Sequence, residues 1–323
     1  MNDLIKAMTY NYPEEIPIYA HMLPAMWMHY GKDLVALAKD YPDIVTHIPD
    51  LDNLEDHMPK TYKPGSHQDE WGCVWSNTEA GMEAIVTGHP VKTREDIRTL
   101  KIPQNRDGRV PHGFMYLRLL DLRGFEEAMI DFAEECDELQ ILIDKVLEYN
   151  CIQVECALPV IDEVFYFGDD LGMQNGLAIG AEKWRKYLKP CFMKIFGLAR
   201  KAGKYVYMHT DGMIYEIIPD LIDCGVNMLN PQIRANGLDN LVRTCKGKVA
   251  INLDLDRQLF PFATPSQIDD HVRECVEALY MPQGGLGLSV ELNYEVPLEN
   301  VAAIFDAVRK YKAYNGGTRI RTE

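Results

Sequence analysis

Short apolar runs, rich in β-branched and aromatic residues, alternate along this chain with longer segments in which apolar residues recur at helical spacing. The runs predict strands at 16–21, 113–117, 163–167, 205–209, 226–229, 249–253 and 286–291, with a weaker one at 71–75. The longer segments predict helices at 33–40, 124–149, 181–201, 213–224, 265–280 and 297–311. This alternation is typical of βα units that build a parallel sheet.

About eight strands alternating with helices over about 300 residues favour a (β/α)8 barrel of the TIM type over a doubly wound sheet. No Gly/Ser linker or change of composition divides the chain, and the Pro-, His- and Asp-rich stretch 50–68 predicts a long excursion. We therefore predict a single α/β domain over residues 1–323, a TIM-type barrel with an elaborated N-terminal region.

Charge and composition narrow the classes of partner. The 33 Lys and Arg residues against 49 Asp and Glu give a formal charge of −16, which disfavours nucleic acid as a partner. Hydrophobic residues make up 47%, ordinary for a globular protein, but charged residues or proline interrupt every apolar run before the ~20 residues of a membrane span. The N-terminus lacks the pattern of a secretory signal, so we expect a cytoplasmic protein.

The reactive motifs that would settle the chemistry at once are missing. The eight cysteines form no CxxC pair and are expected to be free thiols. There is no P-loop, GxGxxG, GxSxG or HExxH motif, so nucleotide-driven chemistry and a serine nucleophile have no support.

Polar side chains instead gather where the predicted strands end. His209 and Asp211 follow the strand 205–209 at i and i+2, so they point the same way at the end where barrel active sites are built. An imidazole and a carboxylate so placed form a two-ligand metal unit or an acid/base pair. The alternative is that Asp211 only caps the next helix.

Three other strands end similarly, in Asp169 and Asp170, in Asp254 and Asp256, and in Glu291 and Asn293. Acidic groups that converge on one rim indicate a site for a metal or for proton transfer. We predict catalytic roles for Asp169, Asp170 and His209, with turn chemistry as the alternative for the two aspartates. Candidates for substrate binding are His21, Trp71, Gln174 and Asn293.

Several stretches resemble the uroporphyrinogen decarboxylase superfamily. They are GDDLGMQNG, the segment from AEKWRKYL to KYVYMHTDG, LIDCGVNMLNPQ and VPLENVAAIFDAVRKY, within about 110–312, with a looser likeness further upstream in DEWGCVW and GHPVKTREDIRTLKIP. The resemblance implies a TIM-type barrel. It also implies one of two chemistries, because the superfamily holds cofactor-free decarboxylases and corrinoid-dependent methyltransferases.

The decarboxylases grip a polycarboxylate through arginines of an N-terminal motif like MRQAGR, whereas this chain has no arginine before Arg94. Methyltransferases of the superfamily that alkylate thiols carry zinc on an HxC pair and a distant cysteine. The resemblance places His209 and Asp211 on the pair and Glu291 as the third ligand. Carboxylates in place of thiolates still suit Zn²⁺ but argue against thiol methylation.

The sequence thus predicts a zinc-dependent enzyme that takes a methyl group from a small, methoxylated or otherwise methylated compound and passes it to a corrinoid protein. The alternatives are a cofactor-free lyase that uses Asp169, Asp170 and His209 on another carboxylate, and a non-catalytic barrel that binds a small ligand. The oligomeric state stays open, with a homo-oligomer among the alternatives.

Overall fold

A computed structural model of the chain describes residues 2–316, which divide into two compact units. Unit 1 takes its described residues from Met1–Gly65, Asn77–Ala84 and Gln232–Glu323, and unit 2 consists of Ser66–Ser76 and Ile85–Pro231. Neither unit is continuous in sequence. The chain passes from one to the other after residues 65, 76, 84 and 231.

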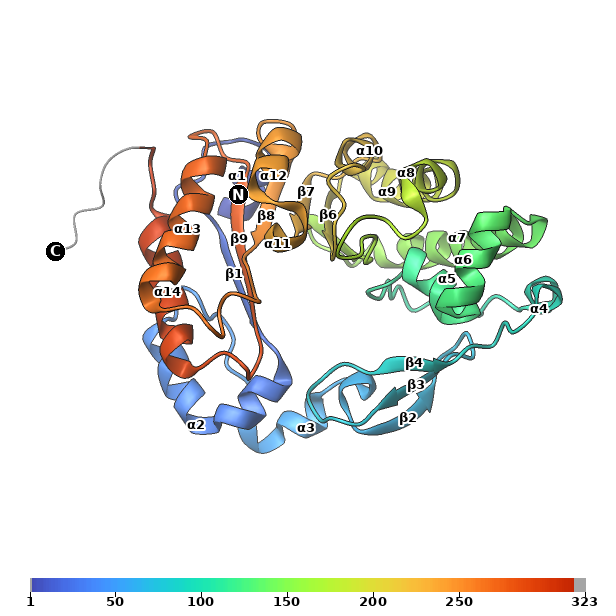
Figure 1. Ribbon diagram of the computed structural model, residues 1–323, viewed down its shortest axis with the longest axis horizontal. Coiled ribbons are helices and arrows are strands. Elements are labelled where there is room, and N and C mark those ends of the chain that lie inside the picture. The colour runs from blue at the N-terminus through green and yellow to red at the C-terminus, as the bar shows by residue number, and fades with distance from the viewer. Residues whose placement is uncertain (1, 317–323) are drawn as a thin grey trace. The chain divides into compact units, whose positions relative to one another are not determined.

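Unit 1 is built on three parallel strands, β1 (Ile18–Met22), β8 (Ala250–Asp254) and β9 (Leu286–Leu292), with β9 between the other two. The helices α13 (Pro265–Leu279) and α14 (Leu298–Lys312) lie side by side (Figure 1). Thr264 starts α13 with a capping box, its hydroxyl accepting from the backbone of Gln267. The other helical elements of the unit are α1 (Asp3–Met8), α2 (Pro24–Asp40), η1 (Leu51–Asn53), α3 (Leu54–His57), η2 (Lys60–Tyr62), α11 (Ile233–Asn236) and α12 (Leu238–Cys245).

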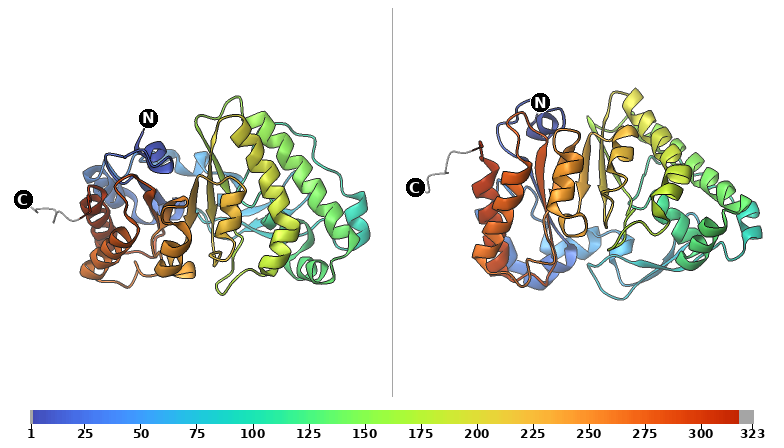
Figure 2. Two further views of the ribbon diagram at one scale, coloured as in Figure 1. Left: turned by 90° about the horizontal axis from the view of Figure 1, so that it is seen from above. Right: turned by 45° about the horizontal axis from the view of Figure 1, so that its top comes forward.

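Unit 2 also holds three parallel strands, β5 (Val164–Gly168), β6 (Tyr205–Thr210) and β7 (Met228–Pro231), with β6 in the middle. Its helices include α7 (Asp137–Ala157) and α9 (Lys189–Lys201), which run side by side (Figure 2). The remaining helical elements are α4 (Arg94–Thr99), α5 (Tyr116–Arg123), α6 (Phe125–Glu134), α8 (Gly180–Lys183), the short π-helix η3 (Trp184–Leu188) and α10 (Ile218–Asp223). A small sheet, β2 (Gly65–Gln68), β3 (Val74–Asn77) and β4 (Ile85–Gly88), lies mostly in this unit, with β3 and β4 antiparallel.

The strands of unit 2 separate an aromatic core from a polar face. Phe167 on β5 packs on Phe114 and on Phe196 of α9, with ring centroids 5.4 and 4.9 Å away. Because side chains alternate along a strand, Gly168 and His209 lie on the opposite face from the residues that precede them. The aromatic core thus fixes the position of these strands, and β6 carries His209 at its carboxyl end.

One of the predicted strands is wrong, and another belongs to a different sheet from the one expected. The run 113–117 begins in a turn and continues into α5, because the carboxylate of Asp169 accepts hydrogen bonds from the backbone amides of residues 115–117 and so starts a helix. The run 71–75 contributes to β3, which pairs antiparallel with β4 rather than joining a parallel sheet. Within residues 2–316, no helix is both long and apolar enough to cross a bilayer.

Candidate metal centre at the ends of β5 and β6

His209 lies at the carboxyl end of β6, in register with Gly168 of β5 and Asn230 of β7. Its Nδ1 donates to the side-chain oxygen of Asn230 at 2.8 Å. This bond fixes the ring and leaves Nε2 to face the carboxylate of Asp211 at 3.3 Å. The second nitrogen of His209 is thereby available as a ligand or as a carrier of a proton.

His112, in the turn before α5, joins the same cluster. The backbone amide of Gly113 donates to the carbonyl of Gly168 at 2.8 Å, and Nε2 of His112 lies 3.2 Å from Asp170. A side chain at residue 168 would exclude this ring, because a Cβ there would come within 2.6 Å of His112 Nδ1. Gly168 therefore provides the space in which His112 sits.

His112, Asp170 and His209 each offer a ligand atom, and these atoms lie within 4.8 Å of one another. Two imidazoles and a carboxylate are an established ligand set of catalytic zinc sites. The outer contacts also suit a metal, since Asn230 orients His209 and the backbone amide of Asp211 donates to Asp170 at 3.1 Å. The donor set thus fits a zinc ion held from within unit 2.

Each histidine of the cluster faces a carboxylate, and this pairing shifts the pKa values. Burial lowers the pKa of His209, but the neighbouring Asp211 carboxylate outweighs it and raises that pKa to about 9. The pKa of His112 is also raised, because its bond to Asp170 overcomes the effect of burial. Burial acts to raise the pKa of Asp170, but the facing His112 imidazole brings it below its ordinary value. Each histidine is therefore matched by an acidic partner.

Asp169 has a different environment from Asp170. It is fully buried, and its two oxygens accept from the backbone amides of Met115, Tyr116 and Leu117 at 3.2, 2.5 and 2.9 Å. Burial raises its pKa to about 7 against the opposing effect of these bonds. Such contacts favour a structural role over the catalytic one predicted from sequence.

The loops that follow β5 and β6 interlock beside the centre. The backbone amide of Gly172 donates to the backbone carbonyl of Asp211 at 3.1 Å, and the backbone amide of Met213 donates to the carbonyl of Met173 at 2.8 Å. A Cβ on Gly212 would lie 2.1 Å from the backbone of Gly172, and Gly212 has a φ of +81°. The two loops pack backbone on backbone, which only glycine allows.

The other predicted residues of unit 2 lie apart from the cluster. Trp71 is buried edge-on against Tyr149, with ring centroids 5.2 Å apart, which favours core packing over substrate binding. Gln174 is exposed in the turn that Met173 and Gly176 close. Its predicted contact with substrate stays a prediction.

Unit 1 carries the remaining predicted residues. Glu291 lies near the carboxyl end of β9, opposite His21 of β1 in register, and its carboxylate pairs with Arg257. Asn293 follows β9 and accepts from the backbone amide of Tyr294 at 2.7 Å. Glu291 as a metal ligand, and His21 and Asn293 as substrate contacts, stay predictions.

The sequence pattern does not single out His112. It sits in no HxD or HxH pattern, and the pattern around it predicted a strand beginning at Gly113. The available signal was the Gly-Asp-Asp sequence 168–170, in which one carboxylate ties down a helix start and the other meets the imidazole. Contacts across more than fifty residues decide its role.

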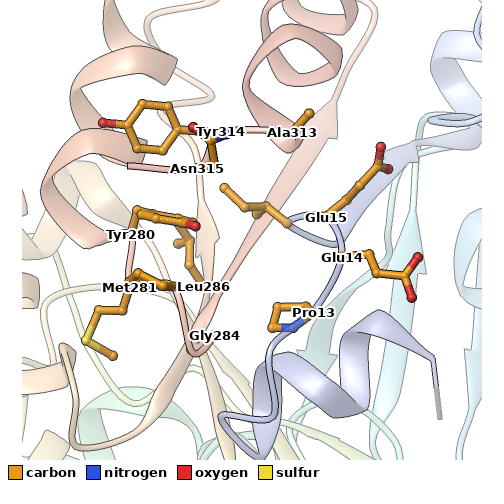
Figure 3. Close-up of a pocket in the computed structure, with 12 residues that line it drawn as sticks. Pro13, Glu14, Glu15, Tyr280, Met281, Gly284, Leu286, Ala313, Tyr314 and Asn315 are labelled. Carbon is orange, nitrogen blue, oxygen red and sulfur yellow. The ribbon is translucent and has the colours of Figure 1, made fainter. Parts of the chain in front are cut away.

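A cavity of about 220 Å³ lies elsewhere in unit 1, where Ile16 precedes β1 and Leu286 starts β9. Figure 3 shows that the carboxylates of Glu14 and Glu15 point away from its tyrosine rings. These carboxylates pair with Lys6 and Lys312, at 3.0 and 3.1 Å. The cavity opens at the amino ends of the strands, the end that barrels use for stability.

A second acidic cluster in unit 2 surrounds Arg118. The guanidinium pairs with Asp69 at 2.6 Å and lies 3.9 Å from Asp121. Burial raises the pKa of Asp121 to about 6, and the negative charge of Asp69 acts in the same direction. Arg118 and, to a smaller extent, His89 act to lower this pKa. A carboxyl whose pKa is higher in the folded than in the unfolded chain stabilises the fold when protonated, and this contribution is lost as the pH rises through about 6.

Asp121→Asn should therefore stabilise the protein in alkaline solution. We expect the free energy of unfolding in urea to exceed that of the wild type by about 2–3 kcal/mol near pH 8, and by about 1 kcal/mol or less near pH 4.5. As a control, Asp131→Asn should destabilise at both values, because Asp131 is buried against Arg94 and Arg123. If Asp121→Asn raised the free energy of unfolding equally near pH 8 and near pH 4.5, the raised pKa of Asp121 would be refuted.

The fold of the whole chain is shared with a known enzyme. The structure resembles a methyltransferase from Methanosarcina mazei with a TM-score of 0.67 and 17% sequence identity, over 96% of this chain and 98% of that one. A dihydropteroate synthase from Xanthomonas albilineans gives a TM-score of only 0.31 at 14% identity, over 46% of this chain and 57% of that one, and supports no conclusion. The sequence matches none of the curated proteins with which it was compared.

Helices alternating with parallel strands, together with this likeness, confirm the predicted α/β fold of the TIM-barrel type. Residues 121–311, more than half of the 323-residue chain, match the family described as uroporphyrinogen decarboxylase (URO-D). The chain belongs to the uroporphyrinogen decarboxylase family, as its motifs suggested.

Proposed function

We propose that this protein is a zinc-dependent methyltransferase that takes a methyl group from a small methylated compound, in the first instance a methoxylated one, and passes it to a corrinoid carried by a partner protein. The observation that carries the proposal is the convergence of His112, Asp170 and His209 at the ends of β5 and β6. Membership of the family and a fold shared with a methyltransferase support the choice of reaction.

Methyl transfer from an ether requires that the negative charge on the leaving oxygen be stabilised. In the proposed reaction the methyl carbon would pass to the corrinoid, the carbon–oxygen bond would break, and the oxygen would keep the electron pair as an alkoxide or phenolate. A zinc ion at the site would act as a Lewis acid and stabilise that charge. His112, Asp170 and His209 would hold the ion, while Asn230 keeps His209 in the tautomer that ligation needs.

A partner protein would present the corrinoid. The chain carries a formal charge of −16, so we expect the partner's contact surface to be basic. Electrostatic attraction of this kind is screened by salt, and methyl transfer should slow as ionic strength rises.

A decarboxylase-like lyase is less consistent with the side chains of unit 2. Arg118 and Arg123, the arginines that the described part of the chain buries, pair with Asp69 and Asp131. They are committed to acidic partners and are not presented to a substrate rich in carboxylates. A non-catalytic binding protein would not need the paired histidines and carboxylates of the cluster.

The test supplies zinc-loaded protein with cob(I)alamin, as a stand-in for the corrinoid protein, and a methoxylated phenol. We expect the cobalt(I) absorption to convert to that of methyl-cobalt(III), and the free phenol to form in equal amount. His209→Ala should abolish both signals. Release of CO₂ from a carboxylated substrate without corrinoid, and no methyl transfer from any methylated donor, would favour the lyase instead.

A further inference from the structure

Asp169 is buried beside the candidate metal centre, yet none of its atoms belongs to the set of ligands. We propose that Asp169 is a positioning residue, which holds His112 in the centre through the backbone of residues 113–117. This inference rests on the proposed metal centre of His112, Asp170 and His209.

The geometry joins three segments at one side chain. The carboxylate of Asp169 accepts from the amides of residues 115–117, at the first turn of α5. The backbone amide of Asp169 itself donates to the carbonyl of His209 at 3.1 Å. Asp169 therefore links the turn that carries His112 to the strand that carries His209.

The neighbouring residues transmit any displacement. Asp170 follows directly and binds His112, and the carbonyl of Gly168, directly before, accepts from Gly113 at 2.8 Å. A shift of the 113–117 backbone would thus move the His112 ring relative to Asp170. On the side of β5 the ring lies close to residue 168, where a Cβ would come within 2.6 Å of its Nδ1.

Two acceptor oxygens are needed to hold this turn. Three backbone donors converge on two oxygens, and the amino end of α5 adds a favourable field for negative charge. An asparagine of nearly the same size replaces one oxygen by an NH₂ group, which would face a backbone N–H and leave it without an acceptor. Asp169→Asn should therefore release the turn with little change in volume.

A merely structural aspartate is the alternative, and Asp131 of α6 provides the matched control. Asp131 is 1% exposed and accepts from Nε of Arg94 and Nε of Arg123, each at 2.8 Å. It belongs to the same unit but to no ligand set. Both variants lose buried polar contacts, but only Asp169→Asn loosens the turn that carries His112.

The experiment measures zinc affinity by competition with a chelator, alongside unfolding in urea. We expect both variants to be less stable than the wild type, and only Asp169→Asn to bind zinc about 10–100-fold more weakly, the range known for outer contacts of metal ligands. Asp169→Glu, which keeps the charge, should recover part of the affinity and serves if the asparagine variant does not fold. Wild-type affinity in Asp169→Asn, or an equal loss in Asp131→Asn, would overturn the inference.

Hydrogen exchange separates this inference from the proposed function. If the wild-type protein binds no zinc, the metal centre is wrong, and amide exchange in the metal-free protein decides the role of Asp169. Faster exchange in Asp169→Asn confined to residues 113–117 would support the anchoring of the turn. Unchanged exchange there would overturn it.

Discussion

His112→Ala is expected to cost the protein its zinc and its activity. The variant removes one of three ligand atoms that lie within 4.8 Å of one another. Loss of a direct ligand should exceed the effect of losing an outer contact, so we expect zinc affinity to fall more than about 100-fold. Elemental analysis after dialysis against a weak chelator, together with the methyl-transfer assay, measures both effects.

His89→Ala is the control for this variant. His89 belongs to the same unit but binds a backbone carbonyl, that of Asp121 at 2.8 Å, so His89→Ala should retain zinc. Full zinc occupancy in His112→Ala, combined with its loss in Glu291→Ala, would replace the present ligand set by the one that the sequence predicted from His209, Asp211 and Glu291.

Gly212→Ala should be the most damaging glycine-to-alanine substitution in unit 2. Its new methyl group would lie 2.1 Å from the backbone of Gly172, at a φ of +81° that alanine adopts only with strain. Neither backbone can yield without breaking the hydrogen bonds between the two loops. We expect a loss of more than about 3 kcal/mol in the free energy of unfolding, the sum of crowding and strain.

Gly203→Ala measures the strain of alanine at positive φ without a close backbone contact. Gly203 precedes β6 with a similar φ of +75°, but within residues 2–316 no atom other than those of its chain neighbours lies within 4 Å of the place that its new methyl group would take. We therefore expect a loss of only about 1 kcal/mol for this variant, in the same urea titration. Equal losses for the two alanines would show that the contact between Gly172 and Gly212 contributes nothing.

The sequence predicted the parallel strands well because each is a short apolar run with polar residues at its end. β6, for example, was expected over 205–209 and extends over Tyr205–Thr210. The same pattern singled out His209, Asp170 and Asp211, which the structure places together. Local alternation therefore suffices where the strand itself carries the side chain to the site.

The sequence pattern predicts the wrong structure where contacts between residues far apart in the chain determine the local conformation. The aromatic run 113–117 predicted a strand, but Asp169, more than fifty residues later, supplies the cap that turns it into the start of α5. His112 became a member of the centre by the same contacts. Likewise, the end of β9 was foreseen at Glu291, but its ion pair with Arg257 depends on the loop after β8.

The division of the chain sets an order for synthesis and folding. Most of unit 2 is one stretch, Ile85–Pro231, whose parallel strands can pair while later residues are still being made. In unit 1, β1 must wait for β9, because Ile18 pairs with Leu288, about 270 residues later in the sequence. Contacts so far apart in sequence form slowly, and β1 lacks its partner strand until β9 has been made.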